Sequence, residues 1–228
     1  MLEKKIDLYI KILLFVFLLF AALIIARYVL SRQSLKESQE KIAALQKLFT
    51  QAEQPTLDKP ILKTTDPRIG TASAKNTVIV FSDFQCPHCA DLAQTLSQFL
   101  AKYRDKILLI WKDFPNPVFP QAKSAAVAAR CAQLEDKFWE YHDFLYANQE
   151  SLGKTVYQEI AKQLGLNIDA FNQCLENQET LPLVEDDFQE GQALKIDGTP
   201  YLFINGQRVS GAASLTDLEK VIEPRTTF

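Results

Sequence analysis

The sequence predicts an α/β domain with an inserted helical subdomain, preceded by an N-terminal transmembrane helix and a helical stalk. Three observations predict this organisation. An apolar run at 77–84 leads directly into a helical pattern, a long helical block follows the second strand, and a hairpin with a last helix closes the chain. Strands that alternate with helices in this way predict a sheet covered by helices.

The first element is the apolar N-terminal segment, within residues 1–30. Ile12 to Ala26 is an unbroken apolar run of 15 residues. The longer stretch Leu8–Leu30 would extend about 34 Å as a helix, enough to span a bilayer core of about 30 Å. A cleaved signal peptide is the alternative, but no small-residue cleavage site follows the run. We therefore expect an uncleaved, single-pass anchor.

The charges that flank this segment do not orient it, because they are nearly balanced on its two sides. The cysteines are more informative: four are present, and two of them lie far from the other two, which suits an oxidising compartment such as a bacterial periplasm. We expect a protein of the bacterial inner membrane with a cytoplasmic N-terminus and a periplasmic main domain. The net charge of −3 gives no argument for nucleic-acid binding, and none is expected.

Residues 31–63 are predicted to form a stalk helix and a linker. The stretch 31–53 lacks Gly and Pro and places Leu35, Ile42 and Phe49 seven residues apart. This spacing allows a homodimeric coiled coil through residues 31–53, and a solvated single helix is the alternative. The proline-rich segment 54–70 predicts an extended linker into the main domain, which covers 64–228.

Within the main domain, apolar and β-branched runs predict strands at 77–84, 107–112 and 201–205. Asn205-Gly206 predicts a tight hairpin turn into a short fourth strand. Apolar residues at helical spacing predict a helix after 77–84, and the insertion at about 120–195 is predicted to be helical throughout. Its expected helices are 122–132, 136–148, 154–164, 167–177 and 181–195.

Cys86-Pro87-His88-Cys89 lies where the strand 77–84 ends and a helix begins. Unpaired N–H groups and the helix dipole favour an anion there, so the Cys86 thiol should titrate below its usual pKa of about 8.5. A structural disulfide across two residues would close almost no loop. A structural zinc site would need four ligands, and Cys131 and Cys174 stand alone. We therefore expect thiol–disulfide chemistry and no resident metal; a soft-metal (copper) handling protein is the less favoured alternative.

Six sequence blocks in order resemble the DsbA-like class of thioredoxin-fold proteins, which includes membrane-anchored members. The resemblance covers residues 66–222, and its blocks are 66–70, 81–89, 112–115, 125–132, 137–143 and 198–206. It implies a thiol:disulfide oxidoreductase with Cys86 as the exposed nucleophile, Cys89 as the buried resolving cysteine, and no cofactor beyond their redox-active disulfide. It also implies a cis peptide bond before Pro200, with the backbone of Thr199 free to pair with a substrate peptide.

The direction of exchange follows from the stability of the Cys86 thiolate. A low pKa makes Cys86 a good leaving group and stabilises the reduced protein, so the protein becomes more oxidising. A cationic His88 would add to this, and the Pro87-His88 dipeptide resembles that of strongly oxidising members. Thr199, however, resembles isomerase-type members. We expect oxidation of exported or periplasmic proteins, with a quinone-linked membrane reoxidase as redox partner; a periplasmic isomerase or reductase, kept reduced by a reductase partner, is the alternative.

Two further expectations concern residues outside this motif. Cys131 and Cys174 fall on predicted helices and are expected to pair in an oxidising compartment, where a loop of about 44 residues would contribute about 4 kcal/mol. Two buried, inert thiols are the alternative. Asp83 is expected to be a solvated carboxylate at a strand end. Val80 stands where many thioredoxin-fold enzymes keep a buried carboxylate, so no proton-transfer residue is assigned.

Overall fold

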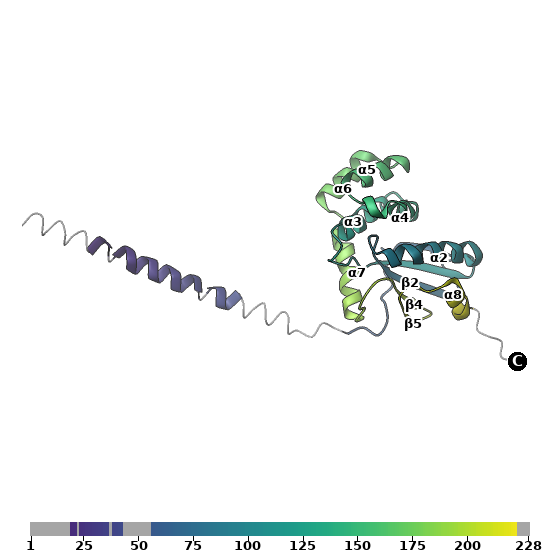
Figure 1. Cartoon of the computed structure of the whole chain (residues 1–228), viewed down its shortest axis with the longest axis horizontal. Coiled ribbons are helices and arrows are strands. Elements are labelled where there is room, and N and C mark those ends of the chain that lie inside the picture. Colours follow the sequence, from purple (N-terminus) through teal and green to yellow (C-terminus); the bar gives the residue numbers. More distant parts are fainter. Residues whose placement is uncertain (1–18, 22, 37, 43–55, 223–228) are drawn as a thin grey trace, which may run out of the picture. The chain divides into compact units, whose positions relative to one another are not determined.

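The computed structural model describes residues 19–21, 23–36, 38–42 and 56–222 (Figure 1). The chain divides into two units, Met1–Gln54 and Pro55–Phe228. The described part of the first unit is helical and exposed almost throughout. Residues 8–18 and 22 of the predicted anchor, and 37 and 43–53 of the predicted stalk, lie outside the described residues. Within the described ranges, no helix combines the length and apolarity needed to cross a bilayer.

The second unit is built on a five-stranded sheet in the order β1-β3-β2-β4-β5. β2 and β3 are parallel, and the other three pairings are antiparallel. In this register Val80 of β2 lies opposite Trp111 on one side and Leu202 on the other. The strands are β1 (Arg68–Gly70), β2 (Asn76–Ser82), β3 (Ile107–Asp113), β4 (Tyr201–Ile204) and β5 (Gln207–Ser210).

β2 is buried on both faces, as its continuous apolar run predicts, because alternate side chains enter two different cores. Val78 and Val80 pack in the larger core, which includes most of the buried helical side chains. Ile79 and Phe81 pack in a smaller core with Phe203 on the other face. β4 and β5 are joined by the predicted tight turn, where Asn205 (φ 51°) and Gly206 (φ 82°) both have positive φ.

The helices confirm the sequence-based pattern to within one or two residues at most ends. α2 buries the predicted face, including Leu92, Leu96 and Phe99. In Figure 1, α3, α4, α5 and α6 gather in one block, and α7 leads back toward the strands. The helices are α2 (Pro87–Tyr103), α3 (Ala122–Gln133), α4 (Phe138–Ala147), the 3-10 turn η1 (Gln149–Ser151), α5 (Lys154–Gln163), α6 (Ile168–Asn177), α7 (Leu181–Ala193) and α8 (Leu215–Ile222).

The prediction of an extended linker over 54–70 is wrong at its C-terminal end. Residues 68–70 form the edge strand β1, paired with β3. The segment before it is fastened to the domain: the Leu57 N–H donates to the Ala193 carbonyl at 2.9 Å, and the Pro67 carbonyl accepts from the Trp111 N–H at 2.9 Å. Prolines are tolerated here because an edge strand pairs on one side only.

Candidate active site

Cys86 is the N-cap residue of α2, with extended backbone angles of φ −78° and ψ 122°. Pro87 follows as the first helical residue and has no N–H to offer. The first free N–H groups of the helix therefore belong to His88 and Cys89, and both help to stabilise the Cys86 sulfur as an anion. The N-terminal end of α2 thus holds the thiolate in place of an ordinary capping oxygen.

The pKa of Cys86 is lowered to about 5. The largest cause is the side-chain hydrogen bond from Cys89; burial opposes it, and a side-chain hydrogen bond from Thr199 and the backbone N–H groups of Cys89 and His88 lower the pKa further. The sequence attributed an additional effect to the ring of His88. In the structure the contribution of His88 is its backbone N–H, and its side chain is exposed.

Cys89 differs from Cys86 although both are free thiols. Burial raises the pKa of the Cys89 thiol, and the neighbouring thiol of Cys86 raises it further, while a hydrogen bond with Ser82 opposes the rise. At neutral pH the pair therefore consists of one thiolate, on Cys86, and one thiol, on Cys89.

The expected exposed nucleophile is less accessible than the sequence suggested, since Cys86 is only 5% exposed and Cys89 1%. The reason is the loop before β4, where the Thr199–Pro200 peptide bond is cis. The carbonyl oxygen of Thr199 lies 3.4 Å from the Cys86 sulfur and accepts a hydrogen bond from it when Cys86 is a protonated thiol. The structure therefore brings the Thr199 carbonyl to Cys86 and has the cis bond before Pro200 that the family resemblance implied, while pairing of the Thr199 backbone with a substrate peptide stays a prediction.

Two hydroxyl groups, those of Ser82 and Tyr146, lie one after the other next to the buried Cys89 sulfur: Ser82 contacts the sulfur and Tyr146 contacts Ser82. The Ser82 hydroxyl, which hydrogen-bonds Cys89, is 2.9 Å from the Tyr146 hydroxyl on α4. Tyr146 in turn donates to the backbone carbonyl of Asp83 at 3.3 Å. Burial raises the pKa of Tyr146 well above its usual value, so this hydroxyl stays protonated. The hydroxyl of Ser82 at the buried sulfur is therefore itself held by a second hydroxyl, that of Tyr146.

The expectation that Asp83 is solvated is wrong, because its side chain is 2% exposed. Its carboxylate accepts from the backbone N–H of Gln85 at 2.7 Å and of Asn116 at 2.8 Å. Burial raises the pKa of Asp83 to about 6; these two hydrogen bonds oppose the rise, and the charges of Cys86 and Asp113 add to it. The residues that follow β3 cover this carboxylate, as the hydrogen bond from the Asn116 N–H shows.

Glutamines that sequence reasoning missed fix the backbone just before α2. The Gln149 side-chain amide donates to the carbonyls of Phe84 and Cys86, both at 2.9 Å. The Gln85 side-chain oxygen accepts from the Gln121 N–H at 2.7 Å. Glutamine in a loop or short 3-10 turn usually faces solvent, so the sequence carries no signal for this role.

A buried ionic cluster was also missed. The Lys112 ammonium lies 2.8 Å from a carboxylate oxygen of Asp66 and 3.2 Å from Asp187 and Glu190. Arg130 pairs with Asp113 and Asp187. A signal was present, since Lys-Asp ends a buried strand and an arginine interrupts the alanine-rich run of α3. The cluster joins β3, α3 and α7 to the segment before β1. It also affects the redox site, because the negative charge of Asp113 raises the pKa of Asp83.

The other two cysteines lie on the helical insertion. Cys131 of α3 and Cys174 of α6 form a disulfide, with their Cα atoms 5.9 Å apart and a sequence separation of 43 residues. This is the pairing that the sequence favoured. Among the described residues, no group of three or more His, Cys, Asp or Glu side chains is arranged to hold a metal ion.

Comparison with known proteins agrees with this architecture. The family model described as thioredoxin matches residues 62–224, most of the chain. The chain belongs to this thioredoxin family. Its fold is similar to the thiol-disulfide exchange protein alpha-DsbA2 of Wolbachia pipientis (TM-score 0.64, 22% identity, 70% of this chain and 87% of that one). It is also similar to oxidised BdbD of Bacillus subtilis (TM-score 0.65, 20% identity, 75% and 97%).

Curated relatives of this thioredoxin-family domain are longer proteins. The chain is 30% identical over 168 residues to Na(+)/H(+) antiporter NhaA 1 of Mycolicibacterium gilvum. This match covers 72% of the chain but 27% of the antiporter. A match to Na(+)/H(+) antiporter NhaA 3 of Salinispora tropica, 30% identical over 154 residues, covers 24% of it. The chain thus spans about a quarter of the length of these relatives.

Proposed function

We propose that the domain is a thiol:disulfide oxidoreductase that oxidises pairs of cysteine thiols in exported proteins. The observation that carries this proposal is the Cys86 thiolate at the N-terminus of α2, with its pKa lowered to about 5 beside a protonated Cys89. The thiolate is the reactive species in disulfide exchange, and a stabilised thiolate is also a good leaving group. The family membership and the fold are consistent with this chemistry.

The reaction begins with the Cys86–Cys89 disulfide. A substrate thiolate attacks the Cys86 sulfur, the bond between Cys86 and Cys89 breaks, and Cys89 leaves and takes a proton. A second substrate thiolate then attacks the substrate sulfur of the mixed disulfide and displaces Cys86 as a thiolate. The substrate loses two electrons and gains a disulfide, while the protein becomes a dithiol in which Cys89 keeps its proton.

The oxidising direction is supported by the balance between these two sulfurs. Everything that stabilises the Cys86 thiolate stabilises the reduced protein, and each 1.4 kcal/mol raises the reduction potential by about 30 mV. Cys89, Thr199 and the helix N–H groups all act in this direction. Thr199 resembles the residue of isomerase-type members, so an isomerase or a reductase is the alternative function of the same site.

The reduction potential, measured by equilibration with glutathione, tests the proposal. A value near about −120 mV would support an oxidase, and a value near about −270 mV would assign a reductant instead. The thiolate absorbance at about 240 nm should titrate well below pH 7 and be absent in Cys86→Ser. A titration above pH 8 would contradict the mechanism.

The reduced protein must pass its electrons on, and we propose that it does so at the membrane, to a quinone-linked reoxidase. The support for this location is the apolar run Ile12–Ala26, continued as Leu8–Leu30. Carbonate extraction of membranes should leave the full chain in the pellet, with the domain accessible to protease from the periplasmic side. Release into the soluble fraction, or protection from external protease, would contradict this placement.

A further inference from the structure

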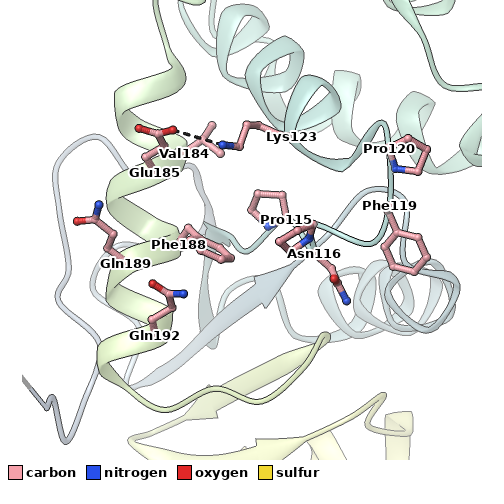
Figure 2. A pocket seen from close by; sticks show the side chains of 11 residues that line it. Pro115, Asn116, Phe119, Pro120, Lys123, Val184, Glu185, Phe188, Gln189 and Gln192 are labelled. Atoms are coloured by element: carbon pink, nitrogen blue, oxygen red, sulfur yellow. Dashed lines mark hydrogen bonds and ion pairs between the residues drawn. The ribbon is translucent and has the colours of Figure 1, made fainter. Parts of the chain in front are cut away.

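A cavity of about 510 Å³ lies between α7 and the loop that follows β3. Figure 2 shows Phe188 projecting from α7 toward Pro115 and Asn116 of that loop, with Gln189 and Gln192 along the same helix. At the far end Lys123 of α3 pairs with Glu185 of α7 at 3.3 Å, and both side chains are exposed. The mechanism proposed above makes no use of this cavity.

The cavity continues toward the redox pair. A second hollow, of about 160 Å³, shares Asn116, Pro117 and Phe188 with the first and is lined at its other end by Thr199. The Thr199 carbonyl lies 3.4 Å from the Cys86 sulfur. We take the two hollows, which adjoin through these shared residues, as one groove with Thr199 at one end and the Lys123–Glu185 ion pair at the other. We call it the α7 groove.

The chemistry of the α7 groove suits an extended peptide. Its walls carry Phe188, Phe119 and prolines, and proline has no N–H, so these walls bind by apolar contact. The exposed side-chain amides of Gln189 and Gln192 offer both donors and acceptors to a peptide backbone. Because residues of α7 and of the loop after β3 line the groove on two sides, an extended segment suits it better than a globular surface would.

We propose that the α7 groove holds the segment of the protein substrate that flanks the reacting cysteine, with an apolar side chain packed against Phe188. This inference rests on the function proposed above and adds a preference to it: substrates with an apolar residue some way along the chain from the cysteine react best. The occupant is a peptide because one end of the groove is lined by Thr199, whose carbonyl lies 3.4 Å from the sulfur to which the substrate becomes joined. Once the mixed disulfide forms, the flanking segment is present at high effective concentration.

The test compares cysteine peptides that differ only in a tail of about ten residues, long enough to follow the groove when extended. One tail contains leucines, one contains serines, and each is placed on either side of the cysteine. For the wild-type chain, KM should be about tenfold lower with the leucine tail, on one side of the cysteine at least. In Phe188→Ala the leucine-tail and serine-tail KM values should become equal.

Phe188 also stacks on Phe114, with ring centroids 4.9 Å apart, so its removal could loosen the fold. A second variant avoids this: Gln192→Trp places a bulky ring over the groove from an exposed position on α7 and should remove the same preference. Val118→Ser is the matched control, because Val118 is 80% exposed on the same loop and does not line the groove. It should keep the preference for the leucine tail.

Equal KM values for the two tails in the wild-type chain would overturn the inference, and so would a preference that survives both Phe188→Ala and Gln192→Trp. Either result leaves the proposed function intact, since the peptides would still be oxidised. Failure of the proposed function looks different: the wild-type chain would oxidise none of the peptides, and both proposals would fall together.

Discussion

The chain carries two pairs of cysteines that share one fold and differ in almost every physical respect. Cys86 and Cys89 lie three residues apart, at the first turn of α2, and are free thiols in the structure. Cys131 and Cys174 lie 43 residues apart, join α3 to α6 and are bonded. Both pairs are buried, so burial does not separate a reactive pair from a structural one.

Two quantities separate the pairs: the size of the loop that the bond closes and the stability of the thiolate that its opening releases. The Cys86–Cys89 bond would close almost no loop, so it adds little to stability, while its opening releases a thiolate that the helix N-terminus stabilises. The Cys131–Cys174 bond constrains a long loop inside the helical insertion. The same covalent bond is therefore easily opened in one place and stabilising in the other.

The largest effect is expected from removing the sulfurs of the reactive pair. Cys86→Ser should abolish peptide oxidation, by about 1,000-fold or more, because the Cys86–Cys89 disulfide that the substrate thiolate attacks can no longer form. Cys89→Ser, given a disulfide-bonded peptide, should instead attack it through the Cys86 thiolate, release one peptide thiol and stay joined to the other half as a mixed disulfide, detectable by gel shift without reductant. Oxidation by Cys86→Ser at more than a tenth of the wild-type rate would contradict the assignment.

Removing the Cys131–Cys174 disulfide should lower stability and leave peptide oxidation intact, whereas removing Cys86 should abolish oxidation. The double variant Cys131→Ala with Cys174→Ala should lower the free energy of unfolding by about 4 kcal/mol, because the unfolded chain regains the freedom of a long loop. Urea unfolding under oxidising conditions measures this. Peptide oxidation by the folded variant should stay near wild type, since neither residue contacts Cys86. A loss below about 1 kcal/mol, or loss of activity in the folded protein, would show that the two pairs are not independent.

The third comparison is between the reduced and oxidised states of the reactive pair as pH changes. Only the reduced chain carries the Cys86 thiolate, whose pKa is about 5 in the folded state and about 8.5 in the unfolded state. A lowered pKa contributes stability that is complete above about pH 8.5 and is lost as pH falls toward 5. The reduced chain should therefore exceed the oxidised chain in stability at high pH, and this excess should shrink toward pH 5.

Chemical unfolding of both states across this range, with the Cys131–Cys174 bond intact, measures the excess. The Cys86→Ser chain is the control: it has no thiolate at this position, so its stability should lack this component. Asp187, whose pKa is raised to about 6, titrates in both states and largely cancels from the difference, whereas the pKa of Asp83 is raised in part by the charge on Cys86 and so contributes to the difference between the states. An excess that is constant or grows toward acid would contradict the low pKa of Cys86.

How much of this could be predicted from sequence differs between the fold and the site. Periodicity located the strands and helices because each buries a regular stripe of side chains, and Asn205-Gly206 identified the closing hairpin. β1 was missed because it is three residues long and follows a proline-rich segment. A strand that short has no measurable alternation, and only its partner β3 reveals it.

Within the site, the motif itself located Cys86 and Cys89 because a helix N-terminus is a local property of the chain. The groups that surround the two sulfurs come from distant segments, and the sequence does not show which of them meet. Asp83 was expected in solvent because nothing local indicates that residues after β3 fold over it, and Ser82 gave no signal at all. Local electrostatics is thus readable from sequence, whereas burial by a remote loop is not.

The smallest expected effect concerns Ser82, the polar neighbour of the less reactive sulfur. Its hydroxyl lowers the pKa of Cys89, so Ser82→Ala should raise that pKa and make Cys89 a poorer leaving group when substrate attacks Cys86. Formation of the mixed disulfide should slow about threefold to tenfold, in line with the loss of about one hydrogen bond. Stopped-flow measurement with a single-cysteine peptide isolates this step.

Tyr146→Phe is the matched control, because it removes the hydroxyl 2.9 Å from Ser82 while leaving the Ser82–Cys89 hydrogen bond in place. If both variants slow the step equally, the effect belongs to packing between β2 and α4 rather than to the hydrogen bond at the sulfur.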